Sequence, residues 1–294
     1  MEAILDVGRQ LTIRHAGHLL AVYHFSAEDV KPFFHPITLG NGNAASLTLA
    51  SPYDHLHHRG LWFCWKFING HNFWEEQPVR HFVRTRRLEV DLTTEDQVRW
   101  TSALDWQLAT GEVMLQEQRV LAVRRPWGEQ QRQRYAIDFD LTFHPALPEV
   151  HLSLLTVQEQ PWGGYAGLGY RPARSMDIKG QLLTSNGPAT SADKGVPARW
   201  ADYAGGLDGS PQSGGIALFD HPENVRHPPP FFVLSPPPFG FVNPSPLFHE
   251  GLRLQSGEVL RLRYRALVHT GLGEHGDLDA EFRTWSLEEE RRGL

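Results

Sequence analysis

Apolar and polar residues alternate with a period of two along much of this chain, and this pattern constrains the fold more than any other feature of the sequence. Within residues 135–143 every second position is aromatic or aliphatic, namely Tyr135, Ile137, Phe139, Leu141 and Phe143. The alternation also occurs in residues 88–104, 112–123, 150–157 and 259–270, and more briefly in residues 215–220 and 231–235. Because successive side chains of a strand point to opposite faces, the pattern predicts strands with one face in a hydrophobic core.

Signals for helices are scarce by comparison. The best candidate is residues 277–289, with Asp277 as a candidate N-cap and Leu278, Phe282 and Trp285 on one face. Short turn-forming segments separate the strands, so antiparallel pairing is expected rather than crossover helices. We therefore predict an all-β fold with few short helices. It is one large antiparallel β-sandwich domain over residues 1–294, of the supersandwich or jelly-roll type.

The composition argues against nucleic acid and membranes as binding partners. The 294-residue chain carries a net charge of −6 with His neutral, which disfavours binding to nucleic acid. No apolar run approaches the roughly 18 to 20 residues that span a bilayer, so no membrane partner is expected. The first ten residues lack the basic and apolar regions of a signal peptide, and Cys64 is the one cysteine, so we expect a cytoplasmic protein. A homodimer is compatible with this composition.

Residues 51–74, SPYDHLHHRGLWFCWKFINGHNFW, concentrate histidine and tryptophan in one segment. If residues 55–59 are extended, His55 and His57 share a face and could chelate one metal ion. Alternatively, a neutral histidine such as His57 or His58 accepts a proton while Arg59 stabilises the developing negative charge. A third interpretation is structural, with the histidines bonded to the backbone of a tight turn. The sequence leaves these three alternatives open.

Aromatic residues follow the histidines at once. Trp62, Trp65 and Trp74 are candidates for a wall that stacks on sugar rings, although core filling is the stronger interpretation for any one of them. Trp62 and Phe63 must face opposite ways in a strand, so the aromatic residues cannot all line one pocket. Cys64 is predicted to be a buried, inert thiol.

A second polar cluster lies in residues 217–227, directly after a predicted strand. It contains Asp220, His221, Asn224, Arg226 and His227. Groups of both signs at the end of a strand suit a small polar ligand, but a salt-bridged structural loop would look the same. Elsewhere, Arg171 and Arg174 could hold a carboxylate in a bidentate fork or could form surface ion pairs.

Several motifs that carry chemistry are missing. The sequence has no GxxxxGK[ST] or GxGxxG phosphate-binding loop and no GxSxG nucleophile elbow, and one cysteine cannot form a CxxC pair. The sequence therefore disfavours a nucleotide-dependent enzyme and a serine hydrolase.

Several segments together resemble the PmoA-like family. Residues 54–74, DHLHHRGLWFCWKFINGHNFW, are similar to the family signature DHPHHRGLWF…NGxDFW. The resemblance continues in order through KPFFHPI, ARWADYAG, GIALFDHPENVRHP, FGFVNPSPLF and RYRALVHTG. Leu56 stands where the family usually has Pro, and Cys64 occupies a position of small residues. Neither departure removes a polar candidate.

The resemblance implies a fold similar to the galactose-mutarotase supersandwich and a role in carbohydrate catabolism. The family name points to a methane oxygenase subunit, but that membrane subunit needs several transmembrane helices, and this sequence has no span of that kind. The motif positions add Asn69 and Asn243 to the candidate residues, and they include Trp74.

These observations lead to one main hypothesis, an enzyme that transfers a proton on a sugar or sugar derivative, of the epimerase, mutarotase, lyase or glycoside-cleaving type. Catalysis is assigned to His57, His58, Arg59 and His221. Substrate binding is assigned to His55, Trp62, Trp65, Asn69, Trp74, Arg171, Arg174, Asp220, Asn224, Arg226, His227 and Asn243. A retaining glycosidase ranks lower, because these segments hold more His than Asp or Glu.

Two alternatives remain open at this point. The first is a metal-dependent enzyme of the same fold, with a divalent ion held by residues from His55, His57, His221 and His227. The second is a noncatalytic sugar-binding or regulatory protein.

Overall fold

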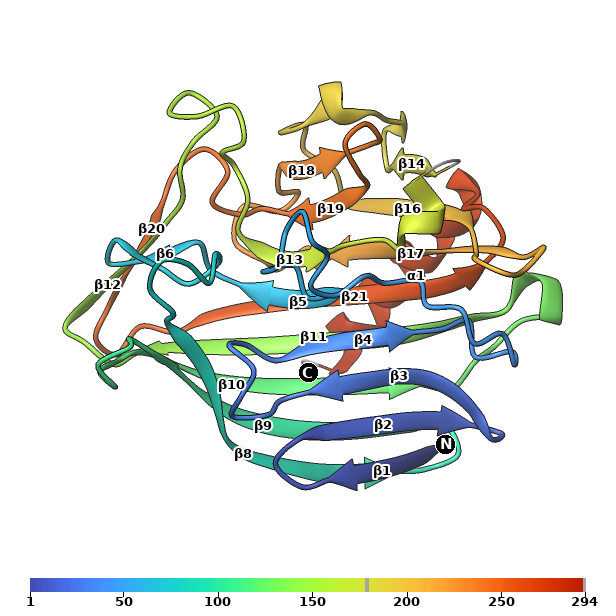
Figure 1. Ribbon diagram of the computed structural model, residues 1–294, viewed down its shortest axis with the longest axis horizontal. Coiled ribbons are helices and arrows are strands. Elements are labelled where there is room, and N and C mark those ends of the chain that lie inside the picture. The colour runs from blue at the N-terminus through green and yellow to red at the C-terminus, as the bar shows by residue number, and fades with distance from the viewer. Residues whose placement is uncertain (178–179, 293–294) are drawn as a thin grey trace.

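Two large antiparallel β-sheets pack face to face in the computed structural model, which describes residues 1–177 and 180–292. The first sheet has eight strands, in the order β1 (Glu2–Asp6), β2 (Gln10–His15), β3 (His18–His24), β4 (Phe33–Ile37), β5 (Leu61–Cys64), β13 (Gly167–Tyr170), β19 (Phe241–Pro244) and β18 (Phe231–Leu234). This arrangement confirms the predicted all-β antiparallel sandwich (Figure 1).

The second sheet has nine strands and forms the other layer. Their order is β15 (Gly187–Pro188), β14 (Gln181–Thr184), β16 (Trp200–Gly206), β17 (Ser213–Asp220), β21 (Leu260–Thr270), β11 (Arg134–Pro145), β10 (Val113–Arg124), β9 (Gln97–Gln107) and β8 (Phe82–Thr93). A smaller third sheet consists of β20 (Leu252–Gln255), β12 (Glu149–Ser153), β6 (Phe67–Ile68) and β7 (His71–Asn72).

Helices are few, as predicted. The described residues contain one α-helix, α1 (His275–Arg292), and three short 3-10 helices, η1 (Gln130–Arg132), η2 (Arg174–Asp177) and η3 (Ser191–Asp193). Within those residues no helix is long and apolar enough to cross a membrane.

The alternation along the strands decides which side chains lie between the sheets. All five alternating apolar residues of β11 are buried: Tyr135, Ile137, Phe139, Leu141 and Phe143. On the facing sheet, the ring of Phe63 lies 5.3 Å from that of Phe143 and 6.3 Å from that of Tyr264, so Phe63 points into this core. Its neighbour Trp62 therefore points to the outer side of β5, as the period of two requires.

Two strand predictions differ from the structure. Residues 88–104 are not one strand but parts of β8 and β9, which meet in a turn at residues 94–96. That turn closes through a hydrogen bond from the Thr94 amide to the Gln97 carbonyl, and the Thr94 hydroxyl accepts from the Asp96 amide. The strand predicted for residues 150–157 ends at Ser153, beyond which the chain turns.

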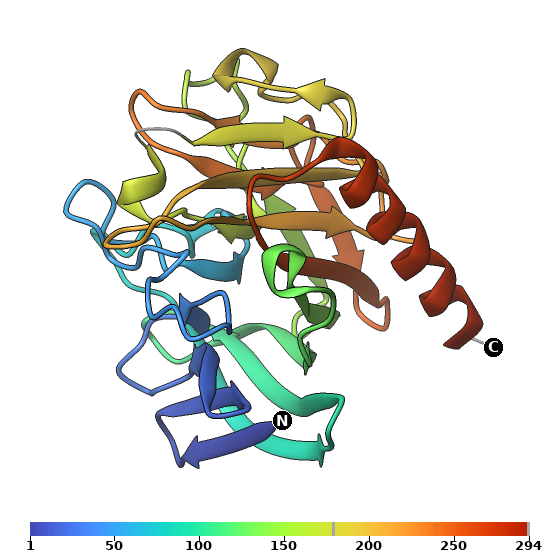
Figure 2. The same ribbon diagram turned by 90° about the vertical axis from the view of Figure 1, so that its right-hand side faces the viewer.

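Helix α1 covers part of the outer face of the nine-stranded sheet (Figure 2). It begins at His275, so Asp277 lies in its first turn and is not the N-cap; its carboxylate instead pairs with Arg134 at 2.6 Å. The predicted apolar stripe is confirmed, because Leu278, Phe282 and Trp285 pack in one cluster with sheet residues such as Phe219.

Truncation of this stripe tests how firmly α1 is docked. Trp285→Ala is expected to lower the free energy of unfolding by about 3 to 5 kcal/mol, since it leaves a large cavity beneath the helix. The measurement is equilibrium denaturation in urea. The matched control is Thr284→Ala at the neighbouring exposed position, which should change stability by no more than about 0.5 kcal/mol. Equal effects of the two substitutions would show that α1 is not docked through this stripe.

Candidate functional site

The histidine-rich segment folds as two successive turns and not as an extended strand. The His55 amide donates to the Pro52 carbonyl at 3.0 Å, and the His58 amide donates to the His55 carbonyl at 2.9 Å. Gly60 ends the turn with a φ of 79°, and a Cβ there would lie 2.5 Å from the Phe34 carbonyl oxygen. Glycine is therefore required where this loop enters β5.

The turns gather three imidazole rings that an extended chain would have separated. The ring of His58 lies 4.7 Å from that of His55 and 4.8 Å from that of His57, and the rings of His55 and His57 are 5.6 Å apart. His58 is buried and also stacks on Phe241 at 5.1 Å. Trp62 supports His58 from the strand beneath it, with the two rings 5.3 Å apart.

These histidines line a cavity of about 230 Å³ on the outer side of the eight-stranded sheet. Most of its other walls are aromatic. The lining residues are His55, His57, His58, Trp74, Glu75, Trp162, Tyr165, Phe232, Leu234, Phe239 and Phe241. We call this space the histidine chamber.

Two of the histidines are held in the neutral form. Burial lowers the pKa of His57 to about 4, and the nearby Lys31 ammonium acts in the same direction. Burial lowers the pKa of His58 well below its usual value, with His57 adding to the effect. His57 is only half-buried, and no hydrogen bond from the described residues occupies its ring nitrogens. It is therefore available as a proton acceptor at neutral pH.

Glu75 is the carboxylate of the histidine chamber. Burial opposes its ionisation, but the Lys66 ammonium outweighs that effect and lowers the pKa of Glu75 to about 2. Tyr165 donates to Glu75 at 2.5 Å, and Lys66 contacts both partners. Glu75 is thus ionised near neutral pH and can accept hydrogen bonds from hydroxyl groups of a ligand.

A second cavity of about 460 Å³ adjoins the first and shares His55, Trp162 and Phe239 with it. The other lining residues are Tyr53, Asp54, Arg171, Arg174, Asp177 and Pro238. We call this space the arginine chamber. The two chambers together form the candidate site.

Asp54 joins the two chambers. Its Oδ2 accepts from Arg171 Nη2 at 2.9 Å and lies 3.4 Å from His55 Nδ1, while its Oδ1 lies 3.5 Å from Arg174. Burial raises the pKa of Asp54, but Arg171 outweighs this and holds it below its usual value. The arginine and histidine groups are thus fixed relative to one another through one carboxylate.

Other residues predicted for the site have structural contacts instead. Arg59 forms a bidentate pair with Glu76, at 3.0 Å from Nε to Oε1 and 2.5 Å from Nη2 to Oε2. Trp65 is fully buried in the core, where its ring lies 5.5 Å from that of Phe143. Trp62 is equally buried and lines neither chamber, so its part is to support His58.

The two predicted asparagines also stabilise the backbone. Asn69, at the turn between β6 and β7, accepts from the His151 amide at 2.7 Å. Asn243 is fully buried, accepts from the Ala166 amide at 3.1 Å and donates to the Leu168 carbonyl at 2.9 Å. Cys64 is buried as predicted, and burial raises the pKa of its thiol to about 11.

The segment 217–227 does not reach the histidine chamber. Its His221 packs against Trp285 of α1, with the rings 5.2 Å apart. Figure 2 shows α1 on one side of the molecule and the blue loops that precede β5 on the other. Residues 54–59 and 220–227 therefore do not form one site, and we assign no catalytic part to His221.

Contacts within segment 217–227 are those of a structural loop. Asp220 accepts from Asn224 at 2.8 Å and contacts His227 Nδ1 at 2.7 Å, and Asn224 also donates to the Arg263 carbonyl at 2.7 Å. Arg226 donates to three backbone carbonyls, those of Pro246, Glu250 and Gly251, at 2.7 to 3.0 Å.

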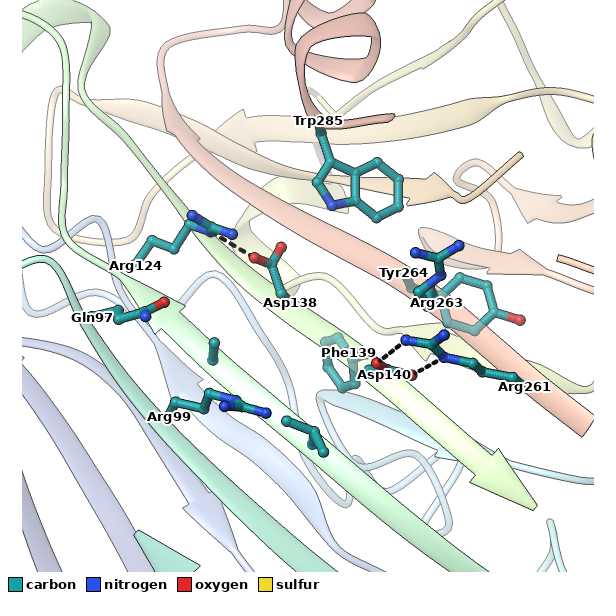
Figure 3. A pocket seen from close by; sticks show the side chains of 12 residues that line it. Gln97, Arg99, Arg124, Asp138, Phe139, Asp140, Arg261, Arg263, Tyr264 and Trp285 are labelled. Atoms are coloured by element: carbon teal, nitrogen blue, oxygen red, sulfur yellow. Dashed lines mark hydrogen bonds and ion pairs between the residues drawn. The ribbon is translucent and has the colours of Figure 1, made fainter. Parts of the chain in front are cut away.

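A third cavity, of about 330 Å³, lies on the outer face of the nine-stranded sheet beside Trp285 (Figure 3). Its floor carries cross-strand ion pairs. Arg124 and Arg265 both contact Asp138 at 2.6 Å, and Arg261 contacts Asp140 at 2.6 Å. Because its carboxylates are already engaged by arginines across the strands, this surface has the character of a stabilising charge ladder.

Metal binding was one alternative for the histidines. Among residues 1–177 and 180–292 there is no group of three or more His, Cys, Asp and Glu side chains arranged to hold a metal ion. The proposed ligands also divide between the two sides of the sandwich, His55 and His57 on one and His221 and His227 on the other.

Several residues of the site were not predicted. Glu75 directly follows Trp74 in the first motif and could have been included on that ground. Tyr165, Trp162 and Phe239 come from distant parts of the chain, and only the pairing of β13 with β5 and β19 brings them to the histidines.

Comparison with known proteins places the chain in a family. A model of a family of unknown function, DUF6807, matches residues 10–283. The chain belongs to this family. The description of this family does not mention the PmoA-like family that the motifs resemble. No curated protein matches the sequence.

Among solved structures, this DUF6807 protein is similar to the GH36 alpha-galactosidase AgaB from Geobacillus stearothermophilus. The two are 11% identical, with a TM-score of 0.38, over 93% of this chain and 41% of that enzyme. The chain thus spans less than half of the enzyme's length, and a likeness at this level carries no argument about function.

The buried histidines predict a loss of stability in acid. Burial, with Arg263 adding to it, lowers the pKa of His221 to about 4, whereas a histidine of the unfolded chain has a pKa of about 6.5. Between these values the unfolded state binds more protons, so the free energy of unfolding falls as the pH is lowered from about 6.5 towards 4.

His221→Gln should make this dependence shallower, by at most about 1.4 kcal/mol per pH unit. The measurement is urea denaturation at several pH values from 7.5 to 4.5. The exposed His144→Gln is the control and should leave the slope unchanged. An unchanged slope for His221→Gln would mean that this histidine is protonated as readily in the folded protein as in the unfolded chain.

Proposed function

We propose that this DUF6807 protein is a carbohydrate enzyme that transfers a proton on a sugar or sugar derivative bound across the two chambers. The observation that carries the proposal is His57, a neutral, half-buried imidazole with unengaged ring nitrogens in an aromatic cavity. A general base has to combine access to the ligand with the unprotonated state, and His57 has both at neutral pH.

The walls of the histidine chamber support a carbohydrate as the ligand. Trp74 and Tyr165 pack together at 5.1 Å, and Tyr165 packs on Phe232 at 5.4 Å, so the cavity has a continuous aromatic side. Aromatic faces suit the apolar C–H faces of a sugar ring, whereas Glu75 and the histidines can bond its hydroxyl groups. This combination of apolar walls with a few fixed polar groups is typical of small-molecule sites.

The arrangement favours a histidine mechanism over a glycosidase mechanism. A glycosidase needs a carboxylic acid that is protonated near its working pH, and Glu75, with a pKa of about 2, is ionised there. In the proposed reaction His57 takes a proton from the ligand, and the electron pair of the broken bond stays on the ligand. The protonated His57 then returns this proton to another atom of the ligand, which restores the base. His55, held beside it by Asp54, can donate a hydrogen bond to the ligand. An epimerase, mutarotase or lyase reaction follows this course.

The first experiment identifies a ligand by thermal shift against monosaccharides, keto sugars and sugar acids. A ligand at about 100 times its dissociation constant stabilises the folded state by about 2.7 kcal/mol, which for a chain of this size raises Tm by several degrees. Turnover of each stabilising sugar is then followed by proton NMR in D2O, which detects both a new product and the exchange of a carbon-bound proton.

His57→Gln is expected to lower the rate of that turnover by about 10² to 10⁴-fold while the affinity for the sugar is retained, because glutamine cannot act as the base. His144→Gln on an exposed position of β11 is the control and should keep full activity. Full activity of a folded His57→Gln protein would contradict the proposed mechanism. Binding with no turnover by the wild-type protein would favour the noncatalytic alternative.

A further inference from the structure

The guanidinium of Arg171 is the least satisfied polar group of the site. Its side chain is 1% exposed, and its Nη2 donates to Asp54 at 2.9 Å. Its Nε and Nη1 have no hydrogen-bond acceptor among the residues that the structure describes. An arginine keeps its charge in a protein, so two buried nitrogens of a cation, with three N–H groups between them, remain to be satisfied.

Arg171 is also held rigidly. It directly follows β13, and its amide donates to the Gly60 carbonyl at 2.8 Å while its carbonyl accepts from Leu49 at 3.0 Å. The guanidinium lies over the ring of Phe239, 3.7 Å from the centroid. A planar guanidinium that is fixed in this way loses little freedom when a ligand engages it. Its end-on fork, formed by Nη1 and the second N–H of Nη2, matches two oxygens of one anionic group.

A second cation stands at the mouth of the same chamber. The Arg174 side chain is about half exposed, lies over the Tyr53 ring at 4.8 Å and approaches Asp54 at 3.5 Å. It can meet an anion as it enters, before the anion reaches the buried fork.

We propose that the arginine chamber is an anion subsite and that the ligand is a sugar acid, whose carboxylate is bound by Arg171 with Arg174 at the entrance. This rests on the proposed function, since it names the substrate class of the same site. A carboxylate fits better than a phosphate because Asp54 and Asp177 line the same chamber. A phosphate carries up to two negative charges at neutral pH and would be repelled more strongly by them.

The contacts between the chambers set the orientation of such a ligand. Asp54 Oδ2 touches both Arg171 and His55, and the Phe239 ring packs against both of them, at 4.7 Å from the His55 ring. With the carboxylate on Arg171, the sugar ring extends past Phe239 towards His55 and His57. The acid group is therefore distant from the aromatic side, where the neutral face of the ring packs.

The test compares sugars that differ only in the acid group: galacturonate with galactose, glucuronate with glucose, and gluconate with sorbitol. Dissociation constants are measured by isothermal titration calorimetry with the full-length protein. For at least one pair the acid is expected to bind about tenfold more tightly or better, the size of effect that a charged hydrogen bond supplies. In Arg171→Gln this preference should disappear, with the affinity for the neutral sugar unchanged within about threefold.

Two further variants sharpen the result. Arg171→Lys keeps the charge but loses the fork and should retain only part of the preference. Arg253→Gln is the control. It removes an exposed arginine that pairs with Glu149 in the small sheet, and this variant should retain the full preference for the acid. If Arg171→Gln does not fold, the half-exposed Arg174→Gln replaces it and should reduce the preference by about threefold or more.

The outcomes separate the two proposals. A neutral sugar that binds as tightly as its acid partner overturns the acid subsite but leaves the carbohydrate function standing. An acid preference that survives in a folded Arg171→Gln protein, or is unchanged in the Arg174→Gln protein that replaces it, also overturns the subsite. If neither member of any pair binds, the proposed function and the subsite fail together.

Discussion

The contact of Phe63 with Phe143 and Tyr264 is the interaction on which the site depends. It fixes one face of β5 in the core between the two large sheets. Strand periodicity then forces Trp62 to the outer side, where it supports His58 and through it the other histidines. The site is thus a layer of loops built on the outer face of a sheet whose inner face is the core.

Strand periodicity accounts for the parts of the fold that the sequence predicts well. The buried face of β11 follows directly from it. The apolar stripe of α1 follows in the same way from the helical period of 3.6, at Leu278, Phe282 and Trp285. The turn at residues 94–96 was missed because it contains neither Gly nor Pro, and because the apolar residues on its two sides, such as Leu92 and Val98, keep the same even spacing. The strand predicted for residues 150–157 was too long because residues 154–157 are still largely apolar, although they pair with no other strand.

The site was only partly predictable, because composition does not reveal which contacts a polar residue makes. His55, His57, His58, Trp74, Arg171 and Arg174 all line the two chambers. Arg59 and Arg226 look equally functional in the sequence, but one is engaged by Glu76 and the other by backbone carbonyls. Asp220 and His221 were grouped with the histidines on composition alone, and the path of β17 carries them to the side covered by α1.

Phe239 has a consequence for the size of molecule that the protein can accept. Its ring belongs to both chambers and stands between Arg171 and His55, on a short loop between β18 and β19. It therefore sets a minimum length for the ligand. A ligand must extend past this ring if one end is to contact Arg171 while the other end contacts the histidines. Related chains could select longer or shorter molecules by changing this one loop, with no alteration to the sheets that carry it.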